Sequence, residues 1–283
     1  MTESIAIARA SNLDVYSIEG IDGSGKTSFI DYFCTRLESL HKEPLLGMRL
    51  PIKTVKLVMI EGIDKILASK QNVDMRILQA ANSTVVKLWQ HRKTRSSCTD
   101  TETPEQTAPI GQPEPVGAVY DNYEKDSIED GTAECYSTSI DSYFPVYILD
   151  RGRASYYAYQ IYAKANTAML PYLLESMRSD IGYRASPEYL WLDISPSLAQ
   201  EAIDTRDNPT GFDQASLDFK EKLRAGYNKF FTKYDTHCLK IPVDQIRKDY
   251  ASINECNEAI FQLWCEKYLS KLIDKINRRF RRF

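Results

Sequence analysis

The sequence has little of the residue types that build zinc sites and nucleophilic active sites. Its 283 residues include only three histidines and six cysteines, and no two cysteines show C-x-x-C spacing. Since zinc sites draw their ligands mainly from these residues at short spacings, a zinc site is not expected. No Ser-His-Asp or Cys-His arrangement is recognisable either. We expect the cysteines to be free thiols in a reducing compartment.

Long apolar runs and a strong charge of one sign are also missing. No segment approaches the ~18 uninterrupted apolar residues of a membrane-spanning helix. The formal charge is -3 at pH 7, which gives no reason to expect a nucleic-acid or membrane-surface partner. Residues 1–12 lack the basic start and the apolar run of a signal peptide. We therefore expect a soluble, cytoplasmic protein.

The remaining composition is that of a globular α/β protein. With 43% hydrophobic residues, the chain is long enough for one large domain spanning residues 1–283. Short apolar runs predict five strands, at residues 15–18, 44–48, 145–149, 188–194 and 238–243. Helical patterns cover residues 29–40, 55–67, 75–89, 155–162, 196–206, about 214–234, and the segment from about 250 onwards. Strands that alternate with helices predict a parallel sheet with crossover helices.

Residues 96–142 differ in character from the rest of the chain. The segment contains four prolines, many Ser, Thr, Asp and Glu residues, and Lys125 as its only basic residue. Such a composition cannot bury enough apolar surface to offset its ordering entropy. We expect a mobile, acidic insertion at a surface loop; the alternative is that part of it folds over a ligand.

A glycine-rich turn lies between the first predicted strand and the first helix. Four of its residues, Gly20, Gly25, Lys26 and Thr27, fit the spacing G-x-x-x-x-G-K-[ST]. That spacing wraps backbone N–H groups around a phosphate chain at a helix N-terminus, with the lysine on the β- and γ-phosphates and the hydroxyl on Mg²⁺. A connection that is merely glycine-rich is the less favoured alternative. We therefore expect ATP and Mg²⁺ as cofactors, and an ATP site formed by Gly20, Asp22, Gly23, Ser24, Gly25, Lys26, Thr27 and Ser28.

A charged pair, Asp150 and Arg151, follows the predicted strand at residues 145–149. In open α/β sheets ligands bind beyond the carboxyl ends of the strands. Both side chains are therefore expected in the same crevice as the glycine-rich turn. The helix that follows carries a stripe of tyrosines, which we interpret as core in preference to a base-stacking surface.

Four separated stretches together resemble the thymidylate kinase family of nucleoside monophosphate kinases. They are residues 18–27, with Asp22 inside the glycine-rich turn; residues 150–160, with the sequence DRGRASYYAYQ; residues 192–199, a strand end and a proline-led helix; and residues 212–227. The resemblance spans nearly the whole chain except the acidic insertion. It implies a three-layer α/β fold of the P-loop NTPase type, with a five-stranded parallel sheet and a lid segment.

The resemblance also implies roles for individual residues. Arg151 is implied to grip the acceptor phosphate, Asp22 to lie near the sugar 3′-hydroxyl, and Tyr159 to pack by the sugar C2′ and favour deoxyribose. The implied catalytic residues are Lys26, Asp22, Asp150, Arg151 and Arg206, the implied metal ligands are Thr27 and Asp150, and the further implied substrate contacts are Arg49, Lys53 and Ser155.

The sequence departs from the family where the base and a catalytic arginine are concerned. The family stacks thymine on a Phe and hydrogen-bonds it with an Arg four residues later, whereas this chain has Gln79 and Ser83 there. These two residues are predicted to contact a different base edge; alternatively the alignment is shifted by a turn and Arg76 supplies the contact. Where some members place an arginine in the phosphate loop, this chain has Gly23, so Arg206 of the lid is predicted to take that role.

The first hypothesis for function is ATP-dependent phosphorylation of a deoxynucleoside monophosphate, with dTMP or a related pyrimidine nucleotide as acceptor. A deoxynucleoside kinase is the alternative, although no residue clearly supplies the carboxylate base that it would need beside the 5′-hydroxyl. The third hypothesis is a nucleotide-binding protein that has lost its acceptor site. The expected partner is a small-molecule nucleotide, and a homodimer is implied by the resemblance alone.

Overall fold

The computed structural model describes residues 14–40, 50–58, 143–178, 187–206, 215–234 and 237–280. Within these residues five strands form one sheet in the order β2-β3-β1-β4-β5, and every neighbouring pair is parallel. The predicted α/β fold with a five-stranded parallel sheet is therefore confirmed. The strands are β1 (Val15–Glu19), β2 (Ile52–Val58), β3 (Phe144–Asp150), β4 (Glu188–Asp193) and β5 (Cys238–Pro242).

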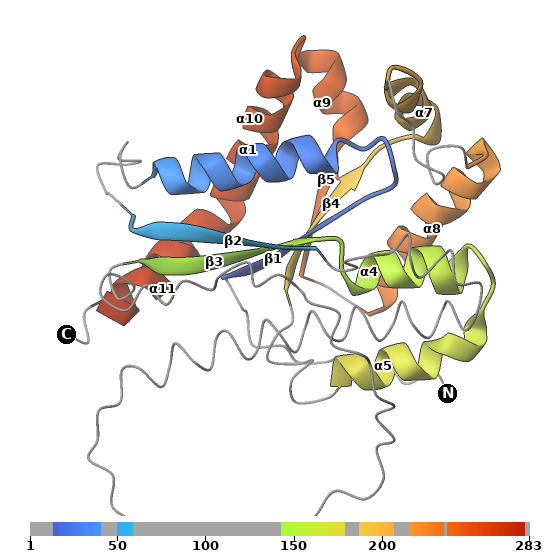
Figure 1. The fold of residues 1–283 in the computed structure, drawn as a ribbon, viewed down its shortest axis with the longest axis horizontal. Helices are drawn as coiled ribbons and strands as arrows, with labels where there is room; N and C mark the ends of the chain where they lie inside the picture. The colour runs from blue at the N-terminus through green and yellow to red at the C-terminus, as the bar shows by residue number, and fades with distance from the viewer. Residues whose placement is uncertain are drawn as a thin grey trace, which may run out of the picture.

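Helices cover both faces of this sheet. Figure 1 shows α1, α9 and α10 on one side of the strands, and α4 and α5 on the other. The sheet is the middle one of three layers, and helices cover both of its faces, as is usual for a parallel sheet. The helical segments are α1 (Lys26–Ser39), α4 (Arg153–Tyr156), the π-helical turn η2 (Tyr157–Tyr162), η3 (Thr167–Met169), α5 (Leu170–Arg178), α7 (Pro196–Asp204), α8 (Leu217–Lys233), α9 (Val243–Asp249), α10 (Ile253–Trp264), the π-helical turn η4 (Cys265–Leu269) and α11 (Ser270–Phe280).

Strand β2 corrects the prediction of a helix beginning near Val55. Apolar residues spaced by three and four from Val55 onwards indicated a helix, but residues 52–58 form the outermost strand and pair with β3. This stretch is rich in β-branched residues, which fit a pleated surface better than a helix. Its two lysines, Lys53 and Lys56, are exposed, as is usual in an edge strand. The predicted strand at residues 44–48 lies outside the described residues.

The crevice of the sheet lies between its central strands. Strand β1 pairs with β3 from Val15 opposite Tyr147 to Ile18 opposite Asp150, so both strands end at the same level. Helix α1 leaves β1 toward one face of the sheet, and α4 leaves β3 toward the other (Figure 1). Strands whose connections diverge in this way open a crevice at their carboxyl ends, where ligands bind in open α/β sheets.

Aromatic side chains fix the position of β1 and its neighbours. On the α1 side, the ring of Tyr16 packs against Phe33, Trp264 and Tyr268, with ring centroids 5.6–6.0 Å apart. Edge-to-face pairs of this kind stabilise a core beyond the area that they bury. Three of the four tyrosines in the predicted stripe are buried, at most 7% exposed, namely Tyr156, Tyr157 and Tyr159, whereas the fourth, Tyr162, is 39% exposed and is not core.

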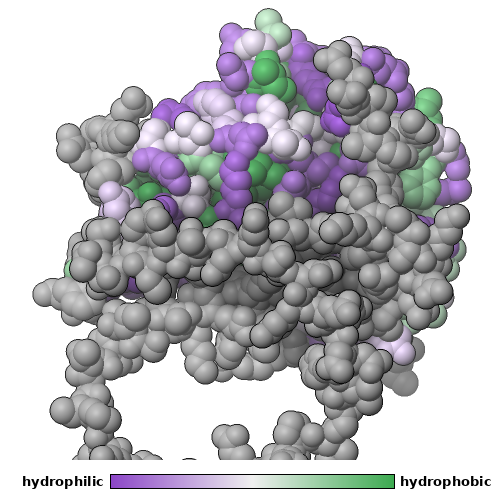
Figure 2. Space-filling view, in the orientation of Figure 1, coloured by the Kyte–Doolittle hydropathy of each residue, from purple (hydrophilic) through white to green (hydrophobic). Residues whose placement is uncertain are grey.

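Several predicted segments lie outside the described residues, namely the acidic insertion at 96–142, the helices at 59–67 and 75–89, and the lid at 207–211. Within the described residues, no helix is long and apolar enough to cross a membrane. On the face shown in Figure 2, the coloured residues are mostly hydrophilic, with hydrophobic side chains in small separate areas. The homodimer stays a prediction.

Candidate active site

The glycine-rich turn forms a phosphate loop at the start of α1. Three of its residues have positive φ angles, Gly20 at 152°, Gly23 at 87° and Gly25 at 88°. Gly25 is the N-cap of α1, which has no side-chain cap and no acidic residue in its first turn. The free N–H groups and the positive end of the helix dipole are thus left open to an anion.

Gly23 is required by contact as well as by its backbone angle. A Cβ atom at this position would lie 2.2 Å from the carbonyl oxygen of Ala199 in α7, whereas one at Gly25 would meet nothing closer than 3.9 Å. The arginine that some family members have at this position could therefore not fit at residue 23 of this chain. Helix α7 packs directly against the loop.

The Gly23→Ala and Gly25→Ala variants should separate these two effects. Both place a Cβ at a left-handed φ, which costs about 1–2 kcal/mol. Only Gly23→Ala adds a clash with backbone, worth about 1–3 kcal/mol more. Urea unfolding is expected to give a larger loss of stability for Gly23→Ala than for Gly25→Ala. Equal losses would show that α7 does not press on the loop.

Four side chains of the crevice form one charged cluster around Asp22. Arg151 donates a hydrogen bond through Nη2 to Oδ1 of Asp22, and Tyr159 Oη donates to Oδ2 at 2.7 Å. Lys26 Nζ lies 4.0 Å from the same carboxylate and donates to the carbonyl oxygens of Gly20 and Ile21, both at 2.9 Å. Arg151 also donates to the Gly20 carbonyl at 3.2 Å. The crevice thus holds two cations on either side of a single carboxylate.

The protonation states of this cluster follow from burial and neighbouring charge. Burial alone would raise the pKa of Asp22, but the positive charges of Arg151 and Lys26 lower it to about 2. Burial lowers the pKa of Lys26 to about 7, and Arg151 acts in the same direction. Asp22 is therefore ionised at neutral pH. The Lys26 ammonium is destabilised until an anion reaches it.

Arg151 has a left-handed backbone, with φ at 67°. A non-glycine residue in this region costs of order 1–3 kcal/mol and persists only where its surroundings hold it. Its N–H donates to the carbonyl of Ile18 at 3.1 Å, and its guanidinium stacks 5.0 Å from the ring centroid of Tyr159. Strain of this kind gathers at functional sites, and here it turns the side chain toward the phosphate loop.

The loop fits the phosphates of a nucleotide and an accompanying Mg²⁺ ion. The Ser24 hydroxyl is buried and has no hydrogen-bond partner among the described residues, so a phosphate oxygen is a suitable acceptor for it. Thr27 is exposed at the start of α1, and Asp150 is half-buried at the end of β3. Across the described ranges, no group of three or more His, Cys, Asp or Glu side chains is placed to hold a metal. Mg²⁺ would then complete its shell with phosphate oxygens and water.

A buried carboxyl lies directly beneath the loop. Glu19, the last residue of β1, is fully buried and accepts hydrogen bonds from Ser17 at 2.7 Å and from Ser155. Burial raises the pKa of Glu19 to about 7, against the lowering effect of these two hydrogen bonds. Gly152 makes room for this arrangement, because a Cβ there would lie 2.6 Å from Ser17 Oγ.

The raised pKa of Glu19 predicts a specific pH dependence of stability. The folded state binds more protons than the unfolded state between the ordinary pKa of 4.5 and about 7. The stability from the protonated carboxyl is therefore complete below pH 4.5 and is lost as the pH rises through 7. Relative to Glu19→Gln, the wild type should lose on the order of 3 kcal/mol across this range. A pH-independent difference in urea unfolding would contradict this pKa.

Two functional candidates near the loop escaped the sequence analysis. Arg247 of α9 donates to the carbonyls of Gly23 at 3.2 Å and Leu198 at 3.4 Å, so that it ties the loop to α7. Tyr227 of α8 donates to the Gly20 carbonyl at 3.2 Å. Both residues lie more than 200 positions from the loop in the sequence. The only sequence signal for them is a single polar or charged side chain within an amphipathic helix, which does not indicate a functional role.

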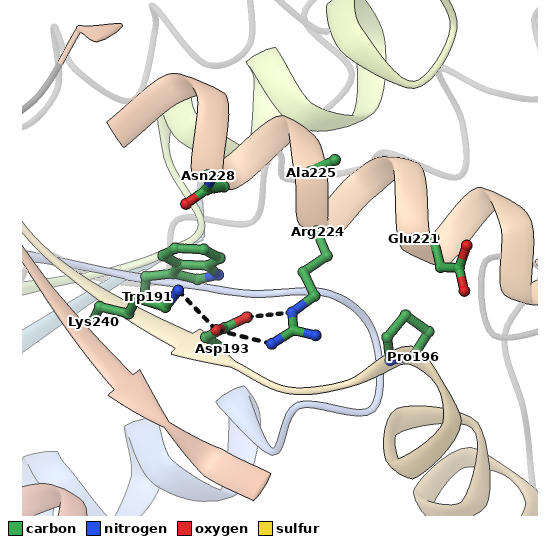
Figure 3. Close-up of a pocket in the computed structure, with 8 residues that line it drawn as sticks. All are labelled: Trp191, Asp193, Pro196, Glu221, Arg224, Ala225, Asn228 and Lys240. Atoms are coloured by element: carbon green, nitrogen blue, oxygen red, sulfur yellow. Dashed lines mark hydrogen bonds and ion pairs between the residues drawn. The ribbon is translucent and has the colours of Figure 1, made fainter. Parts of the chain in front are cut away.

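A second cluster holds α8 against the end of β4 (Figure 3). Asp193 accepts hydrogen bonds from Arg224 Nε at 2.6 Å and Nη2 at 3.1 Å, and Lys240 Nζ lies 3.0 Å away. Lys240 also stands 4.5 Å from the ring centroid of Trp191. A cleft of about 460 Å³ opens beside these side chains, lined by Trp191, Asp193, Pro196, Glu221, Arg224, Ala225, Asn228 and Lys240. None of the lining residues belongs to the phosphate loop. The ion pairs of Asp193 with Arg224 and Lys240 hold α8 against β4 and β5.

The remaining predicted site residues are placed as follows. Ser155 is 3% exposed and bonded to Glu19 and Tyr227, so it lies under the loop and does not line the crevice. Lys53 lies opposite Pro145, near the amino end of β2, and the structure does not bring it to the crevice. Arg206 is exposed after the end of α7 and stays a prediction. The predicted substrate contacts Arg49, Gln79 and Ser83 lie outside the described residues.

Comparison with known proteins gives a likeness in structure alone. No protein-family description matches the sequence, and no curated protein matches it. Among solved structures that match is a deoxyadenosine kinase from M. mycoides with bound dATP, at 12% sequence identity and a TM-score of 0.48, over 88% of this chain and 97% of that chain. A likeness at this level carries no statement about substrate. The sheet and the loop of this chain themselves define an α/β fold of the phosphate-loop type.

Proposed function

We propose that this protein is an ATP-dependent phosphotransferase that phosphorylates a deoxynucleoside monophosphate, with dTMP or a related pyrimidine nucleotide as acceptor. The observation that carries the proposal is the shared carbonyl of Gly20. Lys26 reaches it from the phosphate-loop side at 2.9 Å, and Arg151 reaches it from the end of β3 at 3.2 Å. Two cations that converge on one carbonyl, Lys26 from the start of α1 and Arg151 from the end of β3, suit two phosphate groups that meet between them.

The proposed mechanism depends on position and charge. The loop amides and Lys26 bind the β- and γ-phosphates, while Arg151 holds the acceptor phosphate in line with the γ-phosphorus. Thr27, with Asp150 nearby, would hold Mg²⁺, which would neutralise part of the charge on the phosphate oxygens. Both Lys26 and Arg151 must leave their carbonyl and carboxylate partners for the nucleotides. Asp22 then becomes available to a sugar hydroxyl.

The preference for a monophosphate acceptor follows from the two carboxylates nearest to the phosphate loop, Asp22 and Glu19. A phosphate oxygen attacks without losing a proton, whereas a sugar hydroxyl needs a general base. Asp22 is a poor base, because its pKa is about 2, and Glu19 is sealed under the loop by Ser17 and Ser155. Neither carboxylate suits a hydroxyl acceptor.

A deoxynucleoside acceptor is the second candidate, and Asp150 is the observation that favours it. This carboxylate is half-buried at the end of β3, and its charge raises the pKa of both Lys26 and Arg151. A carboxylate in this position is able to accept the proton of a 5′-hydroxyl.

One assay separates the candidates. The protein is incubated with ATP, Mg²⁺ and a panel of deoxynucleosides and deoxynucleoside monophosphates, and ADP release is followed. Release with monophosphates alone supports the first proposal, and release with nucleosides supports the second. If no acceptor in the panel gives ADP release although the protein still binds ATP, only a nucleotide-binding role would remain.

A further inference from the structure

Three side chains donate to a single carbonyl oxygen in the crevice. The Gly20 oxygen accepts from Lys26 Nζ at 2.9 Å, Arg151 Nη1 at 3.2 Å and Tyr227 Oη at 3.2 Å. A carbonyl oxygen has two lone pairs, so three donors compete for it. A donor added by Tyr227 therefore weakens the hold of the carbonyl on Lys26 and Arg151. Both cations are then released more easily to a nucleotide.

Tyr227 stands at one end of a buried chain of oxygens. Its Oη lies 2.7 Å from Ser155 Oγ, and Ser155 in turn contacts Oε2 of Glu19. The chain therefore runs from the Gly20 carbonyl through Tyr227 and Ser155 to Glu19, with three gaps between its oxygens. Ser17 occupies the other carboxylate oxygen at 2.7 Å and takes no part in the chain.

The number of hydrogens decides which way this chain is bonded. The two hydroxyls of Tyr227 and Ser155 provide two hydrogens for three gaps. If Glu19 is ionised, Ser155 donates to Glu19 and has no hydrogen left for Tyr227. The single Tyr227 hydrogen then goes to the nearer acceptor, Ser155 Oγ at 2.7 Å, in preference to the Gly20 carbonyl at 3.2 Å, which loses its third donor. If Glu19 is protonated, it donates to Ser155, Ser155 donates to Tyr227, and Tyr227 donates to Gly20. All three gaps are filled only in the protonated form.

We propose that Glu19, Ser155 and Tyr227 form a hydrogen-bond switch that positions the phosphate loop: protonation of Glu19 turns the Tyr227 hydroxyl onto the Gly20 carbonyl and frees Lys26 and Arg151 for ATP. This proposal rests on the proposed function only in its use of ATP as the ligand. The three residues are positioning residues, since none of them touches the reacting groups.

The surroundings of the chain suit a change of protonation near neutral pH. The charged groups that face Glu19 are Lys26 from α1 and Arg151 from the end of β3, and both stabilise its ionised form. Burial acts in the opposite direction and sets the pKa of Glu19 at about 7. Burial also holds the pKa of Tyr227 well above its usual value, so its hydroxyl keeps its proton.

The test is the ratio of ATP affinities of the Tyr227→Phe variant and the wild type between pH 5.5 and 8.5, measured by calorimetry without an acceptor. At pH 5.5 the variant should bind ATP ~3–10-fold more weakly, as the loss of one hydrogen bond predicts. The ratio should approach one at pH 8.5, where the wild type has already turned Tyr227 away. Lys26 is present in both proteins, so its own titration cancels in the ratio.

Two further comparisons remove a general structural effect. In a Glu19→Gln background, the amide donates to Ser155 at every pH, so the effect of Tyr227→Phe should be constant across the range. Tyr189→Phe removes another buried hydroxyl, beside Phe230 and Phe231 of α8, and should leave ATP affinity unchanged. A ratio for Tyr227→Phe that does not vary with pH in the wild-type background would overturn the switch.

Failure of ATP binding by the wild type at every pH would remove the proposed function but would still leave the switch testable. In protein labelled at the tyrosine ¹³Cζ, the Tyr227 resonance should then shift with an inflection near pH 7, which Glu19→Gln abolishes. Lys26, which has a similar pKa and bonds to the same carbonyl, is removed by measuring both proteins in a Lys26→Met background. An inflection that survives Glu19→Gln in that background would overturn the switch on its own.

Discussion

The Lys26→Met variant is expected to lose phosphotransferase activity by ~10²–10³-fold or more while remaining at least as stable as the wild type. The loss of activity follows because Lys26 is the loop cation nearest to the β- and γ-phosphates, and single preorganised groups at such positions contribute this much to rate. The variant should be at least as stable because the Lys26 side chain is only 7% exposed, and methionine does not bring a charge into this buried place. A pKa lowered to about 7 means that the folded state disfavours the charged form.

The stability difference should depend on pH with a defined sign. Between pH 7 and the ordinary lysine pKa of 10.5, the unfolded wild type binds more protons than the folded one, so its stability rises with pH. The advantage of Lys26→Met in urea unfolding is therefore largest below pH 7 and shrinks toward pH 10. Lys222→Met is the matched control, since Lys222 is half-exposed on α8 and pairs with Asp218. Activity that survives in Lys26→Met would remove the phosphate loop from the mechanism.

The Arg151→Ala variant is expected to lose ~10²–10³-fold in kcat/KM for the acceptor, with a smaller change in the KM for ATP. Arg151 is the only described cation that joins the end of β3 to Asp22 and to the loop carbonyl of Gly20. Its guanidinium suits bidentate contact with a phosphate, so Arg151→Lys should recover only part of the loss. Steady-state kinetics with each substrate varied in turn give the two constants.

The backbone of Arg151 provides an independent check. With φ at 67°, alanine at this position keeps the left-handed strain, whereas glycine relieves it. Although glycine normally destabilises a protein relative to alanine, Arg151→Gly should therefore have a free energy of unfolding about 1 kcal/mol higher than Arg151→Ala, as measured by urea unfolding. Arg278→Ala, on the exposed face of α11, is the control for loss of charge alone. Equal stability of the two Arg151 variants would contradict the strained geometry.

The phosphate loop was the part of the site most open to prediction from sequence. Its signal is local, because glycines, lysine and hydroxyl residues must follow one another between a strand and a helix. The positions of Gly20, Gly25 and Lys26 in the structure match that expectation. The pair Asp150 and Arg151 was also placed correctly at the carboxyl end of its strand, because parallel strands end at one edge.

The contacts that join distant segments could not be predicted. Tyr227 and Gly20 are separated by 207 positions, and Arg247 and Gly23 by 224. Both pairs form only because α8 and α9 return to the loop in the folded chain. Glu19 lay just after the predicted strand at residues 15–18, and its single charge gave no sign that Ser155 of α4 would bond to it. The role of Ser155 under the loop followed from the same long-range packing.

The error at β2 has a local cause. Residues 55–58 were assigned to a helix by the spacing of their apolar residues, which fits a helix if Val55 is taken together with the positions that follow it. The β-branched residues and the edge position of the strand favour a pleated conformation instead. Ile52 packs into one core cluster, and Val55 and Leu57 on the other face of the strand pack against a second, so β2 lacks the strict two-residue alternation that would have marked it as a strand.

The central claim is that two nucleotides meet end to end between Lys26 and Arg151. A crystal structure with a non-hydrolysable ATP analogue, Mg²⁺ and dTMP tests it most directly. The account predicts the β- and γ-phosphates on the loop amides and Lys26, and Arg151 moved from Asp22 to the phosphate of dTMP. Arg151 still bonded to Asp22, with dTMP bound elsewhere or the analogue away from Lys26, would contradict it.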